Sequence, residues 1–163
     1  MKTQPVVPAG VAFSADGVPG PDALDRARHV FLAGNGLPER WRGCERFTVL
    51  ETGFGRGDGF LAAWDAWRGD AARSGRLDFI SIERHPFERD ALARLHAGSA
   101  LPALARQLVD AWPPLVPSLH ALHFDDRRVR LLLAFGDVGD WLPEIVARVD
   151  AFFFDGLRSR GAV

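Results

Sequence analysis

The chain of 163 residues has little cysteine, no long apolar run and almost no net charge. Its one cysteine, Cys44, excludes an internal disulfide framework and is typical of a reducing compartment. No apolar run reaches the roughly 18 residues that span a bilayer, and Met1–Gly10 lacks the apolar core of a signal peptide. The net charge of −1 provides no global basic field of the kind that favours nucleic acid. We therefore expect a cytoplasmic protein that makes no contact with a membrane.

Enough apolar residues are present for one folded domain, since hydrophobic residues make up 47% of the chain and charged residues 25%. Short runs of β-prone residues predict four strands, the first of them buried: Phe47–Leu50, Leu77–Ile82, Val129–Phe135 and Ala151–Phe154. Helical spacing of apolar residues predicts segments that alternate with the strands: Asp22 (as N-cap) to Gly34, Phe60–Trp67, Phe87–Ala97, Leu101–Trp112 and Val138–Val146, the last kept short by Pro143. This alternation predicts a doubly wound α/β fold with a parallel sheet.

The last predicted strand carries three consecutive aromatic residues, Phe152–Phe154, followed by nine residues, Asp155–Val163, without a strand or helix pattern. An uncovered apolar edge favours aggregation. We therefore expect that another chain covers this edge or that the domain is truncated, and that the chain alone is poorly soluble and inactive.

A glycine-rich loop follows the first predicted strand and precedes a helix, with Glu51 ahead of Gly53, Gly55 and Gly57. Glycines let the backbone turn tightly against a ligand, and the helix N-terminus offers N–H donors to a carboxylate or phosphate. The acidic Glu51 would repel a pyrophosphate and instead suits a ligand with an ammonium group, such as the methionine part of S-adenosylmethionine. A tight turn with purely structural glycines is the alternative.

Carboxylates also end the other three strands. Glu83 can accept hydrogen bonds from both hydroxyls of a ribose, and its alternative is a solvated loop acid. Asp137 can accept from an adenine amino group, with Trp141 or Phe135 stacked on the ring, and can equally serve as the N-cap of the next helix. Asp155 belongs to the edge of the sheet at which α/β ligands bind.

Other residues give weaker signals. The five histidines show no metal-ligand spacing, except for His120 and His123 in an expected loop, and we predict no metal site. Arg127, Arg128 and Arg130 could contact phosphates or form a solvated face.

Taken together, several segments resemble the methyltransferase domain of the bacterial tRNA 5-methylaminomethyl-2-thiouridine biosynthesis protein. The segments are Val30–Trp41, Phe47–Trp67, Ile80–Phe87 and Leu131–Glu144, and the resemblance runs from about Asp25 to Gly156. It implies a Rossmann-like class I S-adenosylmethionine-dependent methyltransferase fold with its C-terminal strands missing. In that family the domain methylates the aminomethyl group on the wobble uridine of certain tRNAs. It is often fused to an FAD-dependent oxidoreductase that prepares the same amine.

The resemblance also implies roles for individual residues. Glu51, Gly53, Gly55 and Gly57 would form the methionine side of the cofactor site. Glu83 would contact the ribose, Asp137 the adenine, and Asp155 would be the catalytic residue that faces the substrate amine. These roles imply S-adenosyl-L-methionine as cofactor and tRNA as partner, with FAD confined to a fused or separate oxidoreductase.

The same resemblance sets the expected domain boundaries: residues 1–24 form an irregular N-terminal segment, residues 25–156 a partial methyltransferase domain, and residues 157–163 a tail outside the family pattern. Two other functions stay open at this point. One is a truncated, catalytically inactive remnant of the domain, and the other is a small-molecule methyltransferase.

Overall fold

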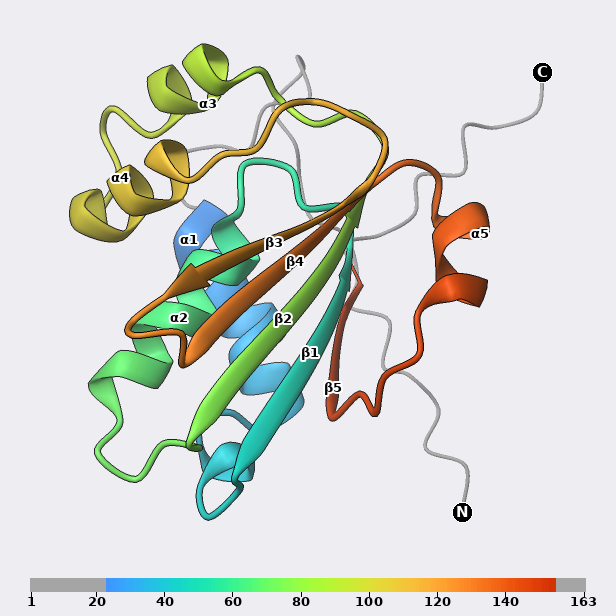
Figure 1. Cartoon of the computed structure of the whole chain (residues 1–163). Helices are drawn as coiled ribbons and strands as arrows, with labels where there is room; N and C mark the ends of the chain where they lie inside the picture. Colours follow the sequence, from blue (N-terminus) through green and yellow to red (C-terminus); the bar gives the residue numbers. More distant parts are fainter. Residues whose placement is uncertain (1–22, 155–163) are drawn as a thin grey trace, which may run out of the picture.

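The computed structural model describes residues 23–154, so Asp22, Asp155 and the two ends of the chain lie outside the described part. A five-stranded sheet with the order β3-β4-β2-β1-β5 forms the centre of the fold (Figure 1). Its parallel strands are β1 (Arg46–Thr52), β2 (Arg76–Glu83), β4 (Val129–Phe135) and β5 (Ala151–Phe154). All four were predicted from their apolar runs, and the α/β class is confirmed. The two central strands β1 and β2 are buried along nearly their whole length, which is typical of parallel strands covered on both faces.

The prediction of a wholly parallel sheet is wrong at one edge. Strand β3 (Leu119–Phe124) runs antiparallel to β4, and it holds the two histidines, His120 and His123, that were expected in a loop. Only alternate residues of β3 are buried, which leaves no continuous apolar run. The hairpin turns through Asp125–Arg127, whose φ angles lie between +48° and +66°. These three residues adopt the left-handed conformation although none is glycine, so the usual glycine signal of a hairpin turn is absent.

Every predicted helical segment is present. The helices are α1 (Ala23–Ala27), α2 (Asp58–Gly69), α3 (Arg89–Leu95), α4 (Pro102–Asp110) and α5 (Val138–Trp141). Helix α2 is longer than predicted, and the other segments have shorter helices. Residues 23–154 also contain one π-helical and three 3₁₀ segments: η1 (Arg28–Leu32), η2 (Ala33–Asn35), η3 (Glu39–Trp41) and η4 (Leu142–Glu144). Within the described part of the chain, no helix is both long and apolar enough to cross a membrane.

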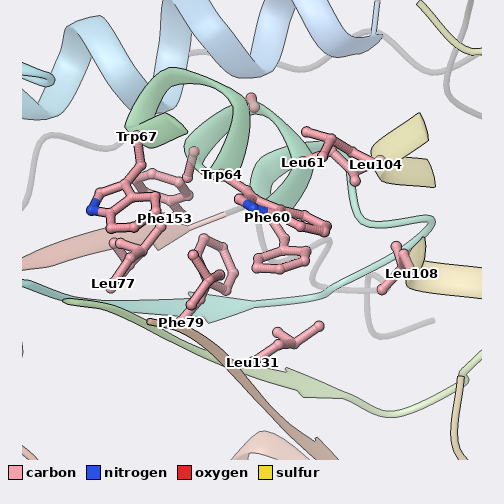
Figure 2. Packing of buried hydrophobic residues seen from close by; sticks show 14 of the residues in the cluster. Phe60, Leu61, Trp64, Trp67, Leu77, Phe79, Leu104, Leu108, Leu131 and Phe153 are labelled. Carbon is pink, nitrogen blue, oxygen red and sulfur yellow. The ribbon is translucent and has the colours of Figure 1, made fainter. Parts of the chain in front are cut away.

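Helix α2 is the centre of the apolar core. Phe60 stacks on Trp64 with ring centroids 5.4 Å apart and meets Phe79 of β2 edge-on at 5.3 Å. On another side of the helix, Leu61 faces Leu104 of α4 (Figure 2). Because α2 is covered by the sheet, by α1 and by α4, seven of its twelve residues are buried. The helix is therefore held rigidly over β1 and β2.

The apolar edge expected at Phe152–Phe154 is smaller than predicted. Phe153 is fully buried, because it stacks on Phe31 of η1 at 4.9 Å and meets Phe79 edge-on at 5.6 Å. Side chains of a strand alternate between faces, so Phe152 points to the other face and is 45% exposed. The Asn35 side-chain amide donates a hydrogen bond to the Phe152 carbonyl at 3.2 Å and covers part of the outer strand edge.

This alternation yields a matched pair of test variants. We expect Phe153→Ala to lower the free energy of unfolding by about 3–5 kcal/mol, because it leaves a cavity among packed rings. Phe152→Ala, one residue away on the open face, is expected to lower it by less than about 1 kcal/mol. Urea denaturation of both variants measures the difference, and equal losses would contradict this description of the edge.

Candidate functional site

Strand β1 lies where the order of the strands reverses. The chain extends from β1 through β2 and β4 on one side, and β5 then returns to the other side of β1. In open α/β sheets, ligands bind beyond the carboxyl ends of the strands at such a point. Two loops are fixed where they leave the sheet at this edge. The Gly53 N–H donates to the Ile82 carbonyl at 2.8 Å, and the Gly136 N–H donates to the Glu83 carbonyl at 2.9 Å.

The loop between β1 and α2 adopts a conformation that requires glycine. The φ angles are +84° at Gly53, +56° at Gly55 and +91° at Gly57. A Cβ atom on Gly57 would lie 2.8 Å from the Phe54 ring and 3.0 Å from Leu108. The Gly57 N–H donates to the Phe54 carbonyl at 2.9 Å, which closes the turn. Gly57 is also the N-cap of α2 and has no side chain to cap the first N–H groups, so a ligand can accept hydrogen bonds from them.

Glu51 lies between the sheet and the first turn of α2. Glu51 is only 2% exposed, and the Ser81 hydroxyl donates a hydrogen bond to the Glu51 Oε1 atom at 2.8 Å. A Cβ atom on Gly59 would clash with Oε2, so the helix can approach this carboxylate only because residue 59 is glycine. Glu51 therefore places an acidic group beneath the N-terminal turn that follows the glycine loop.

Glu83 connects the end of β2 to the glycine loop. Its Oε2 accepts a hydrogen bond from the Gly55 N–H at 2.8 Å, and its Oε1 accepts one from the His85 N–H at 2.9 Å. A carboxylate has about four acceptor positions, so Glu83 keeps capacity for hydroxyl donors of a ligand. The structure thus brings together two features that are 28 residues apart in sequence.

Asp137 is the N-cap of α5, the alternative that its position after β4 left open. Its Oδ1 accepts from the Gly139 N–H at 2.8 Å, and its Oδ2 lies 3.7 Å from the Arg84 guanidinium. Its side chain is half-exposed, so the carboxylate can still accept from a ligand. Of the two aromatic residues suggested for stacking on an adenine, Phe135 is buried against Trp112 and His120. Trp141 is partly buried and donates its indole N–H to the Phe135 carbonyl at 3.1 Å.

Asp155 lies outside the described residues, directly after Phe154 in the sequence. Its role as the catalytic residue therefore stays a prediction.

His96 contacts the glycine loop, and sequence reasoning did not identify this contact. His96 follows α3, is 7% exposed, and its Nε2 lies 2.7 Å from the Arg56 carbonyl in the middle of the glycine loop. Burial lowers the pKa of the imidazole below its ordinary value, against the opposing effect of the carbonyl, so the ring is neutral at physiological pH. His96 is 40 residues from Arg56 in sequence, and no residue spacing or motif connects the two positions, so the sequence alone could not predict this contact.

The remaining candidates lie elsewhere or form no site. Arg130 makes a bidentate ion pair, at 3.1 and 3.2 Å, with buried Asp78 near the amino ends of the strands, far along the sheet from the glycine loop. Among residues 23–154, no three or more His, Cys, Asp or Glu side chains are grouped so that they could hold a metal ion. A hollow of about 520 Å³ opens on the sheet face opposite α2, between Ile80, Leu132 and the segment after α5.

The glycine loop can be tested without a ligand. We expect Gly57→Ala to lower the free energy of unfolding by about 1–3 kcal/mol, because the left-handed backbone and the Phe54 ring both oppose a Cβ atom. Gly69→Ala at the other end of α2 is the control, since a Cβ there meets no atom within 4 Å. Denaturant titration compares the two variants, and an equal effect at both positions would show that the loop tolerates a side chain.

Comparison with known proteins adds to this geometry. The sequence model of a family described as S-adenosyl-L-methionine-dependent methyltransferase matches residues 99–159. The tRNA 5-methylaminomethyl-2-thiouridine biosynthesis bifunctional protein MnmC of Methylibium petroleiphilum is 56% identical, covering 96% of this chain and 26% of the relative. Its counterpart in Aromatoleum aromaticum is 51% identical, covering 93% of this chain and 26% of the relative. The chain therefore spans about a quarter of the length of these relatives.

A solved structure agrees at the level of the fold. The crystal structure of MNMC2 from Aquifex aeolicus matches 89% of this chain and 48% of its own chain, with a TM-score of 0.64 and 18% sequence identity. Sequence identity near one half along almost the whole chain, the family match and the shared fold lead to one conclusion: the chain belongs to the S-adenosyl-L-methionine-dependent methyltransferase family that includes the MnmC proteins.

Proposed function

We propose that this chain transfers a methyl group from S-adenosyl-L-methionine to the 5-aminomethyl group of wobble 2-thiouridine in tRNA. The observation that carries the proposal is the glycine loop at the reversal of strand order, held to Glu83 through the Gly55 N–H at 2.8 Å. The relatives that share about half of its residues are named for 5-methylaminomethyl-2-thiouridine biosynthesis in tRNA. The tRNA substrate is part of the proposal, because the chain spans only a quarter of their length.

The residues at this edge fit the cofactor. The loop glycines, Gly53, Gly55 and Gly57, have no side chains that would keep a ligand away from the backbone. The N-terminus of α2 beside them has no side-chain cap from Gly57, which suits the carboxylate of a methionine moiety. Glu51, buried beneath that turn, supplies the acidic group that suits the ammonium of the same moiety. Glu83 keeps acceptor capacity for the ribose hydroxyls, and the half-exposed Asp137 for the adenine amino group.

The chemistry proposed here depends mostly on positioning. S-adenosyl-L-methionine, held by the glycine loop and Glu51, would supply a methyl group on a sulfonium. The amine lone pair would form the N–CH₃ bond, and sulfur would keep the electron pair of the S–CH₃ bond that breaks. Holding a neutral amine in line with that bond lowers the entropic part of the barrier. In our proposal Asp155, outside the described residues, holds the amine and stabilises the ammonium that forms before it loses a proton.

The proposal also includes partners and a compartment. The net charge of −1 provides no general attraction for tRNA, so recognition would depend on local groups around the wobble uridine. The relatives are named bifunctional proteins. We propose an FAD-dependent oxidoreductase, fused or separate, that prepares the amine, and a cytoplasmic location consistent with the single cysteine.

The class of cofactor is tested by calorimetry of the chain with S-adenosylhomocysteine and with NADH. We expect S-adenosylhomocysteine to bind more tightly, and Glu83→Ala to weaken it by about 1–3 kcal/mol, roughly 5- to 150-fold, because ligand hydroxyls and the Gly55 N–H lose their acceptor. Glu88→Ala, at an exposed carboxylate nearby, is the control and should bind like the unmodified chain. Tighter binding of NADH would contradict the proposal.

The substrate is tested by incubating the chain with labelled S-adenosyl-L-methionine and tRNA that carries 5-aminomethyl-2-thiouridine. We expect label on this tRNA and none on tRNA with an unmodified wobble uridine, because only the former offers an amine. Label transferred only to small amines would favour a small-molecule methyltransferase. Cofactor binding without any transfer would favour the inactive remnant.

A further inference from the structure

The centre of the glycine loop is attached to helix α3 by a hydrogen bond that involves His96. The His96 Nε2 lies 2.7 Å from the carbonyl oxygen of Arg56, the residue between Gly55 and Gly57. His96 as a whole residue is 7% exposed. A hydrogen bond shielded from water is stronger than the same bond on the surface, so this contact can fix the peptide group that follows Arg56.

The chemistry of the two groups determines which nitrogen carries the proton. A carbonyl oxygen can only accept, so Nε2 must donate. The other ring nitrogen, Nδ1, is buried and has no partner among the described residues. A proton on Nδ1 would be a buried donor without an acceptor, which is costly. The geometry therefore requires the neutral ring with its proton on Nε2.

The side chain of Arg56 reinforces the same attachment. Its Nε donates to Oδ2 of Asp58, the first residue of α2, at 2.8 Å, and its Nη1 lies 3.4 Å from the Leu95 carbonyl. Both Arg56 and Asp58 are mostly buried here. The end of α3, the loop and the start of α2 thus form one hydrogen-bonded unit.

The loop needs such an attachment because its backbone is unusually free. Gly55 and Gly57 flank Arg56, and glycine loses more conformational entropy on ordering than any other residue. Glu83 accepts a hydrogen bond from the Gly55 N–H, and the Phe54 carbonyl accepts one from the Gly57 N–H. The contact of His96 with the Arg56 carbonyl adds a third fixed point between these two.

We propose that His96 is a positioning residue of the cofactor site: by donating to the Arg56 carbonyl, it holds the glycine loop in the form that binds the methionine end of the cofactor. The binding part of this inference rests on the proposed function, whereas the ordering of the loop does not. His96 contacts the loop and not the ligand, so it acts through Arg56.

The test compares three variants by calorimetry with S-adenosylhomocysteine. His96→Leu removes the donor, and we expect its affinity to fall about five- to tenfold. His96→Gln keeps an N–H donor at a similar reach, and we expect affinity within about twofold of the unmodified chain. Leu92→Val, at a fully buried position of α3 one turn earlier, should lower the melting temperature without this loss of affinity. Unchanged affinity in His96→Leu, or equal losses in His96→Leu and His96→Gln, would overturn the proposal.

A second readout needs no ligand and separates this inference from the proposed function. Hydrogen exchange of the Gly55 and Gly57 amides should accelerate about fivefold or more in His96→Leu and stay unchanged in Leu92→Val. If the unmodified chain fails to bind S-adenosylhomocysteine, the proposed function fails, and the exchange result alone then decides whether His96 orders the loop. Unchanged exchange in His96→Leu would overturn that role.

Nitrogen NMR of the unmodified chain should show that the His96 ring carries its proton on Nε2. A proton on Nδ1 instead would contradict the geometry.

Discussion

The close approach of helix α2 to strand β1 is the constraint on which the rest of the structure depends. The helix can lie this near because Gly59 leaves space for the Glu51 carboxylate of β1. In the loop before the helix, Gly57 leaves space for the Phe54 ring and for Leu108 of α4. Further along the helix, Phe60, Trp64 and Trp67 fill the volume between α2 and the sheet. The same packing that stabilises the core therefore fixes the helix N-terminus directly above the carboxyl end of β1, which is the place where a ligand can use it.

The candidate site follows from this packing and from the order of the strands. Because parallel strands end at one edge, the glycine loop, Glu83 and Asp137 come together although they are far apart in sequence. The side chains that hold the glycine loop contact its backbone groups: Glu83 accepts from the Gly55 N–H, and His96 donates to the Arg56 carbonyl. Catalysis by positioning requires such a fixed frame, since a flexible loop would lose the entropic advantage on each binding event.

Sequence reasoning predicted the parts of the fold that local patterns encode. The apolar runs of β1, β2, β4 and β5 were sufficient to predict the α/β class. The glycines before α2 led to the candidate site, which stays a prediction. Sequence reasoning missed β3, because a half-buried edge strand with His120 and His123 has no such run. It also expected Phe153 to be exposed, since its partner Phe31 is more than a hundred residues away. The His96–Arg56 and Ser81–Glu51 contacts are likewise tertiary, and no spacing in one sequence reveals them.

The central claim is that the cofactor binds at the carboxyl edge of β1 and β2. Titration of the isotope-labelled chain with S-adenosylhomocysteine, followed by amide NMR, tests it most directly. The account predicts that the largest shifts occur at Gly53, Gly55, Gly57 and the residues after Glu83. Shifts confined to the hollow on the opposite sheet face, around Thr48, Ile80 and Leu132, would contradict it.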